Sequence, residues 1–137
     1  MSTLLEQARD AAKQAYAPYS HFPVGAAVET DCGVFTGCNI ENASYGLTIC
    51  AERVALWKAI SEGATRIERL ALSCIQAPEG APAESRMPCG ACRQVMAEFL
   101  APEAQIEIDG VGVITLAELL PQPFQLGTPS CLGKTQP

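Results

Sequence analysis

The stretch CAERVALWKAI, residues 50–60, and the stretch IERLALSCI, residues 67–75, decide the fold. In the first stretch the apolar residues recur with a helical period, and Gly63 is a suitable stop, so we expect a helix. The second stretch is short and mostly apolar, which predicts a buried strand. A helical pattern that leads into a buried strand indicates an α/β fold, in which helices cover a sheet.

The N-terminal part adds a further helix and a hairpin. Thr3 begins a sequence that resembles a capping box, and apolar residues follow at helical spacing until Pro18. Residues 22–30 and 34–40 are β-prone, and the turn-forming segment 31–33 joins them. We therefore expect an antiparallel hairpin at one edge of the sheet.

The C-terminal half continues the alternation of strands and helices. Residues 76–87 are rich in Pro and Gly, which predicts a surface loop before a helix that ends at Pro102. Residues 105–108 and 111–114 predict two short strands around a tight turn, and Thr115 is expected to cap a last short helix. The result is an α/β sandwich.

Length, charge and cysteine usage limit the classes of function. The 137 residues suit one domain, residues 1–137, and no apolar run approaches the roughly 18 residues of a membrane span. The N-terminus does not resemble a signal peptide, so we expect a cytoplasmic protein whose seven cysteines are metal ligands or buried thiols. A net charge of -6 without a Lys/Arg cluster disfavours a nucleic-acid partner and leaves a small neutral molecule as substrate.

Two short motifs predict a metal site. Cys50, Cys89 and Cys92 supply three thiols at the starts of two expected helices, where the helix dipole stabilises thiolates. A catalytic zinc takes three protein ligands and keeps one position for water, whereas a structural zinc takes four. Cys-x-Glu followed by Pro-Cys-x-x-Cys is the known signature of zinc deaminases that act on nucleobases. We therefore predict one Zn²⁺ per subunit, and His21 is not expected to be a ligand.

Two residues beside Cys50 have predicted roles. Glu52 lies on the same first turn, near the metal but not bound to it, and is the candidate catalytic proton shuttle. Three thiolates leave Zn²⁺ a weak Lewis acid, so we expect the permanent charge of Arg53 to offset them by contacting a ligand sulfur. The alternative is that Arg53 is a surface helical charge.

Four sequence blocks together resemble the cytidine deaminase family, specifically its small single-domain members. They are YSHFPVGAA (residues 19–27), GCNIENASY (37–45), CAER (50–53) and PCGACRQ (88–94). The resemblance implies a three-layer α/β/α sandwich with a mixed five-stranded sheet and helices on both faces. It also implies a homotetramer in which neighbouring subunits complete each other's pockets.

The same resemblance implies which residues bind the substrate. Asn39 and Glu41 match the pair that holds the ribose 3′-hydroxyl, and Phe22 matches the aromatic wall of the nucleoside pocket. The backbone N–H of Ala51 would bind the pyrimidine carbonyl, and Tyr45 and Phe124 match positions that help to build the pockets between subunits. Simpler alternatives exist for each of these residues. Phe22 could be a core residue, and the Asn/Glu pair could be polar loop residues without a ligand. Tyr45 and Phe124 could be buried at a subunit contact without touching substrate.

The predicted reaction is hydrolytic deamination of cytidine and 2′-deoxycytidine to uridine and deoxyuridine, with release of ammonia. Two alternatives stay open at this point. One is a deaminase of another cytosine nucleoside, such as blasticidin S. The other is a structural-zinc or thiol-redox interaction module, because Cys-x-x-Cys also occurs in such proteins.

Overall fold

A computed structural model describes residues 2–127. Its elements, in chain order, are α1 (Leu4–Ala12), β1 (Val24–Thr30), β2 (Gly33–Cys38), the 3-10 helix η1 (Tyr45–Leu47), α2 (Ala51–Ser61), β3 (Ile67–Cys74), the 3-10 helix η2 (Ala83–Arg86), α3 (Gly90–Phe99), β4 (Gln105–Ile108), β5 (Gly112–Thr115) and α4 (Leu116–Leu119). Among the described residues, no helix is long and apolar enough to cross a membrane.

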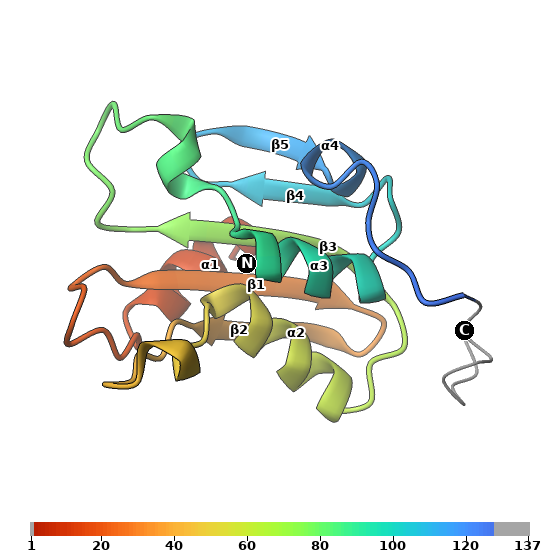
Figure 1. Ribbon diagram of the computed structural model, residues 1–137, viewed down its shortest axis with the longest axis horizontal. Coiled ribbons are helices and arrows are strands. Elements are labelled where there is room, and N and C mark those ends of the chain that lie inside the picture. The colour runs from red at the N-terminus through yellow and green to blue at the C-terminus, as the bar shows by residue number, and fades with distance from the viewer. Residues whose placement is uncertain (1, 128–137) are drawn as a thin grey trace.

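One mixed sheet of five strands organises the chain, in the order β2-β1-β3-β4-β5 (Figure 1). β1 is antiparallel to β2 and to β3, and β5 is antiparallel to β4. β3 and β4 are parallel, so α3 is the crossover that connects them. The expected hairpin is therefore present and the predicted mixed five-stranded sheet is confirmed.

Helices cover both faces of this sheet (Figure 1), which confirms the three-layer sandwich. Because successive strand side chains point to opposite faces, neighbouring residues join different cores. Val28 and Leu72 pack with α2, α3 and α4 in the larger core. Ala27 and Ala71 pack under α1 in the smaller one, against Leu4.

Two glycines let the helices approach the hairpin closely. A Cβ at Gly25 would lie 2.0 Å from the carbonyl oxygen of Ala8 in α1, and a Cβ at Gly37 would lie 2.5 Å from the backbone nitrogen of Ala55 in α2. Any side chain at either position would push the helix off the sheet. The second contact matters for the site, because it sets where α2 begins.

The structure corrects some expected boundaries. The first helix ends at Ala12 rather than continuing toward Pro18, because Lys13 caps it by donating its backbone N–H to the carbonyl of Asp10. The expected loop 76–87 contains η2. Both predicted capping boxes, at Thr3 and Thr115, are present. Cys131 lies outside the described residues.

Candidate metal centre

The three predicted thiols converge at the start of two helices. Cys50 is the N-cap residue of α2, Cys89 is the N-cap residue of α3, and Cys92 lies in the first turn of α3. The Sγ atoms of Cys50 and Cys89 are 3.9 Å apart, those of Cys89 and Cys92 are 3.5 Å apart, and all three lie within 4.8 Å of one another. Zn–S bonds of about 2.3 Å at tetrahedral angles separate sulfurs by about 3.8 Å. The sulfur spacing therefore fits one zinc ion.

The trio is open to solvent on one side. Cys92 is buried and Cys50 is half-buried, whereas Cys89 is exposed. Within the described residues, these three cysteines are the group of Cys, His, Asp and Glu side chains gathered closely enough to hold a metal. Three ligands and an open side match a metal that keeps one coordination position for water.

The pKa values of the Cys50 and Cys92 thiols shift in opposite directions. A hydrogen bond with Cys92, supported by Arg53, lowers the pKa of the Cys50 thiol despite its partial burial. The same hydrogen bond, together with burial, raises the pKa of Cys92. One thiolate is therefore available before a metal binds, and binding of zinc must release the remaining thiol protons.

Arg53 lies directly against this trio. Its Nη2 donates a hydrogen bond to Cys50 Sγ at 3.4 Å, and its Nε is buried without a hydrogen-bond partner in the described part of the chain. A surface helical charge would direct its guanidinium to water instead. The contact is the one that our hypothesis requires, and its effect on the metal stays a prediction.

Glu52 is a buried carboxyl beside the sulfurs. It lies in the first turn of α2 and is 4% exposed. Burial raises the pKa of this carboxyl to about 7, and the negative charge of Cys50 adds to the shift. A carboxyl with a pKa near neutrality can both accept and donate a proton under ordinary conditions.

Comparison with known proteins decides the family. The protein-family model described as the cytidine and deoxycytidylate deaminase zinc-binding region matches residues 1–107. The chain belongs to this deaminase family. It is 46% identical over 126 residues to the cytidine deaminase of Halalkalibacterium halodurans, which covers 88% of this chain and 91% of that relative.

Solved structures of deaminases have the same fold. The cytidine deaminase of Burkholderia pseudomallei superposes with a TM-score of 0.77 at 42% identity, covering 90% of this chain and 100% of that one. The cytidine deaminase of Mycobacterium tuberculosis superposes with a TM-score of 0.76 at 44% identity, covering 90% of this chain and 95% of that one. The resemblance inferred from four short blocks therefore extends over most of the chain.

In this deaminase fold, Asn39 ties β2 to the start of β1. Its Oδ1 accepts a hydrogen bond from the backbone N–H of Val24 at 2.8 Å, and its Nδ2 donates to the carbonyl of Phe22 at 2.9 Å. The side chain is buried, with 8% of the residue exposed. An amide keeps a second N–H and a second lone pair, which are what a substrate hydroxyl would need.

Glu41 holds the preceding loop. Its Oε1 accepts hydrogen bonds from the backbone N–H groups of Tyr19 and Ser20 at 3.0 and 3.1 Å, and its Oε2 accepts one from the Ser20 hydroxyl. The Ser20 hydroxyl, followed by the backbone donors, lowers the pKa of Glu41 and so favours the ionised carboxylate. Glu41 also lines a cavity of about 340 Å³ together with Tyr19, Ser20, Tyr45 and Thr48.

The two aromatic residues expected to build shared pockets lie at the surface. Tyr45 is 76% exposed, and its ring packs edge-on against Tyr19 with centroids 6.1 Å apart. Phe124 is 70% exposed, and its carbonyl accepts a hydrogen bond from Gln94 Nε2 at 3.0 Å. Within one subunit, neither ring is buried by the described residues. Phe22 is half-buried, and Ala51 is the first residue of α2, where helix N–H groups lack intrahelical partners.

Sequence reasoning assigned no role to Ser20 or Arg93, although both lie in the quoted blocks. Ser20 donates to Glu41, as described above. Arg93 donates from Nε to the carbonyl of Pro88 at 2.9 Å and from Nη1 to the carbonyl of Leu119 at 2.8 Å. The contacts with Glu41 and Leu119 join residues more than 20 positions apart, so spacing alone could not reveal them.

Proposed function

We propose that the protein is a zinc-dependent deaminase that converts cytidine and 2′-deoxycytidine to uridine and deoxyuridine with release of ammonia. One observation carries the proposal: three thiols at the spacing of a tetrahedral zinc site lie beside a buried carboxyl whose pKa is near neutrality. The relatives that match most of the chain bear the name cytidine deaminase.

In this proposal Cys50, Cys89 and Cys92 bind the zinc ion. Bound zinc lowers the pKa of a coordinated water so that a nucleophile forms at neutral pH. The permanent charge of Arg53 beside Cys50 reduces the negative charge that three thiolates place on the metal. A structural zinc needs neither a water position nor a neighbouring acid, so the buried carboxyl favours catalysis over a structural or redox module.

Glu52 carries the protons in the proposed reaction. Its carboxylate accepts a proton from the attacking water and delivers it to N3 of the cytosine ring, while the water oxygen bonds to C4. The second proton of the water then passes through the same carboxyl to the departing 4-amino group, which leaves as ammonia. The oxygen stays on C4 as the carbonyl of the product, so the atoms of one water are consumed.

In this proposal the substrate is oriented by the segment just before β1, the segment just after β2 and the start of α2. We propose that Asn39 and Glu41 bind the ribose 3′-hydroxyl, Phe22 forms a wall of the pocket, and the Ala51 N–H binds the pyrimidine carbonyl. The ionised state of Glu41 supports its part, because a carboxylate accepts a strong hydrogen bond from a hydroxyl group.

The proposal includes a homotetramer in which Tyr45 and Phe124 complete the pockets of neighbouring subunits. Their exposure supports this, because large aromatic side chains at 76% and 70% exposure gain from burial at an interface. We also place the enzyme in the cytoplasm, because thiolate ligands and further free cysteines suit a reducing compartment.

The test is a substrate panel with zinc-loaded protein. We expect loss of the 4-amino chromophore with cytidine and deoxycytidine, and much slower loss with cytosine, which lacks the ribose contacts. A higher rate with blasticidin S than with cytidine would move the assignment to that alternative. No absorbance change with any of these compounds would reject a deaminase, and a zinc ion with four protein ligands by X-ray absorption would support the structural alternative.

A further inference from the structure

The segment that leads into Cys89 has little to hold it in place. Residues 75–85 connect β3 to the end of η2 and include Pro78, Gly80 and Pro82. η2 (Ala83–Arg86) contributes no buried residue, and the hydrogen bonds from Ala81 N–H to Pro78 and from Ser85 Oγ to Pro82 are local. A segment like this needs an attachment to the rest of the fold if the residues after it are to be well placed.

Arg86 provides that attachment. Its Nη2 donates to the carbonyl of Pro78 at 2.8 Å, which closes the loop on itself, and its Nη1 donates to the carbonyl of Asp109 at 3.3 Å. Its Nε is buried without a hydrogen-bond partner in the described part of the chain. The guanidinium is therefore partly buried, and it connects the loop to the turn between β4 and β5.

The turn that receives Arg86 is shaped for it. Gly110 has a φ of +82°, and a Cβ built there would lie 2.1 Å from Arg86 Nη1. Glycine is thus favoured at this position by the backbone conformation, and any side chain there would displace the guanidinium of Arg86. Two residues 24 positions apart therefore fit one another.

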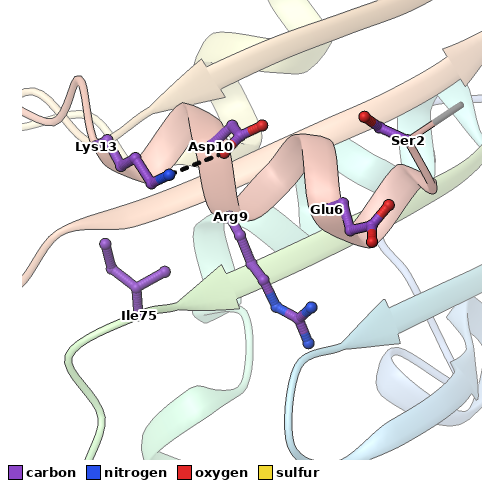
Figure 2. A pocket seen from close by; sticks show the side chains of 6 residues that line it. All are labelled: Ser2, Glu6, Arg9, Asp10, Lys13 and Ile75. Atoms are coloured by element: carbon purple, nitrogen blue, oxygen red, sulfur yellow. Dashed lines mark hydrogen bonds and ion pairs between the residues drawn. The ribbon is translucent and has the colours of Figure 1, made fainter.

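The carbonyl under Arg86 belongs to a residue that is itself firmly held. Asp109 accepts hydrogen bonds from Arg9 Nε and Nη2, both at 2.8 Å, and from Ser73 Oγ at 2.8 Å. Its backbone N–H donates to the carbonyl of Leu72. The Arg9 side chain extends away from α1 (Figure 2) and pairs with Asp109, so Arg86 rests on a point that α1 and β3 both secure.

The residues after Arg86 carry this constraint to the metal centre. Met87 packs against the larger core, Pro88 is buried, and the Pro88 carbonyl is held by Arg93. Cys89 follows at once and is the exposed member of the trio. We propose that Arg86 is a positioning residue that holds Cys89 in place for zinc. This inference rests on Cys89 being a zinc ligand, as proposed above.

The variant that tests this is Arg86→Met, which keeps the aliphatic stem and removes both hydrogen bonds. We expect zinc transfer to a chromophoric chelator to become about tenfold faster. Residues that orient a metal ligand typically change metal affinity by about 10 to 100-fold, and Arg86 should lie at the low end because it acts on Cys89 through the backbone. Arg86→Lys can reach one carbonyl at a time and should restore part of the difference. Arg66→Met is the matched control, because that guanidinium pairs with Glu68 at the surface, and it should release zinc at the wild-type rate.

Gly110→Ala tests the contact between Arg86 and the β4–β5 turn by changing the turn, because the added methyl displaces the guanidinium. In the wild-type background it should also speed zinc release, and in the Arg86→Met background it should add little. If the two substitutions had additive effects on the rate of zinc release, Gly110→Ala would act through the turn and not through Arg86, and the proposal would be overturned. If Arg86→Met does not fold, the Arg86→Lys and Gly110→Ala variants give the same comparison.

A purely structural role is distinguished by measuring the melting temperature beside the release rate. A lower melting temperature with unchanged zinc release would show that Arg86 stabilises the loop without positioning Cys89, and would overturn the inference. Cys89→Ala separates this result from failure of the proposed ligand set. If Cys89→Ala retains stoichiometric zinc, the ligand assignment is wrong. If it loses zinc while Arg86→Met behaves as wild type, only the positioning role of Arg86 is wrong.

Discussion

Replacing Glu52 with glutamine is the sharpest perturbation of the proposed chemistry. The two side chains have nearly the same volume, and the position is only 4% exposed, so the variant should fold with the core around α2 intact. The amide is neutral, as the carboxyl is in its protonated form, so the change introduces no buried charge. Zinc binding should be retained because Glu52 is not one of the three thiol ligands.

The expected loss of rate follows from the number of proton transfers assigned to this residue. A positioned general acid or base typically contributes 10²–10⁴-fold, and glutamine can neither accept nor release a proton. Because the proposal makes Glu52 the base toward water and the acid toward the ring nitrogen and the amine, we expect kcat to fall by at least about 10⁴-fold. Such a loss corresponds to about 5 kcal/mol of transition-state stabilisation.

The assay follows the absorbance of cytidine for the Glu52→Gln variant, with zinc content and melting temperature measured on the same preparation. Glu62→Gln is the matched control, since Glu62 is an exposed residue that caps the other end of α2. That control should keep a rate within about twofold of wild type. A zinc-replete, folded Glu52→Gln variant with near-normal activity would refute the assignment of the proton shuttle.

Three further predictions concern the metal and the fold. Cys89→Ala should lose zinc and lower the melting temperature, because zinc joins α2 to α3, whereas Cys32→Ala, an exposed position in the hairpin turn, should keep both. Arg53→Ala should lose zinc about 10 to 100-fold faster and turn over more slowly, and unchanged retention together with unchanged turnover would reject its role. Hydrogen bonds from Arg9 hold the pKa of Asp109 below its ordinary value, so this carboxylate stabilises the fold above about pH 4 and the contribution is lost as the pH falls through the lowered pKa. Asp109→Asn should therefore cost about 1 to 3 kcal/mol by denaturant unfolding at pH 7 and progressively less as the pH falls through the lowered pKa, and a cost that does not change with pH would show that the ion pair is not the cause.

Much of the secondary structure could be predicted because its signals are local. The capping boxes at Thr3 and Thr115 place backbone and side-chain partners three residues apart, and both form as expected. The hairpin is recognisable from two β-prone runs around a short turn. The end of the first helix at Ala12 was not predictable, because small apolar residues continue at helical spacing beyond it while the chain turns away to reach β1.

Some features of the candidate site could also be predicted from local sequence, whereas others depend on tertiary contacts. Cys-x-Glu and Cys-x-x-Cys each lie on one helical turn, so their spacing alone indicates that the residues of each motif lie close together. The lowered pKa of Glu41 depends on donors from Ser20 and Tyr19, about 20 residues earlier in the chain, and no sequence motif indicates these hydrogen bonds. The surface position of Tyr45 in a single subunit likewise follows from packing rather than from periodicity.

By itself, the sequence predicted most of the helices and strands, the three candidate sulfur ligands and the acid beside Cys50, because each of these has a signature within a few residues. Only the tertiary structure gave the distances between the sulfurs of the two motifs, the burial of the carboxyl at position 52 and the position of Arg86 over Gly110 against the carbonyl of Asp109. Those features arise where the crossover of β3, α3 and β4 brings distant segments together. Their distances and desolvation depend on packing across the sheet, which local spacing does not specify.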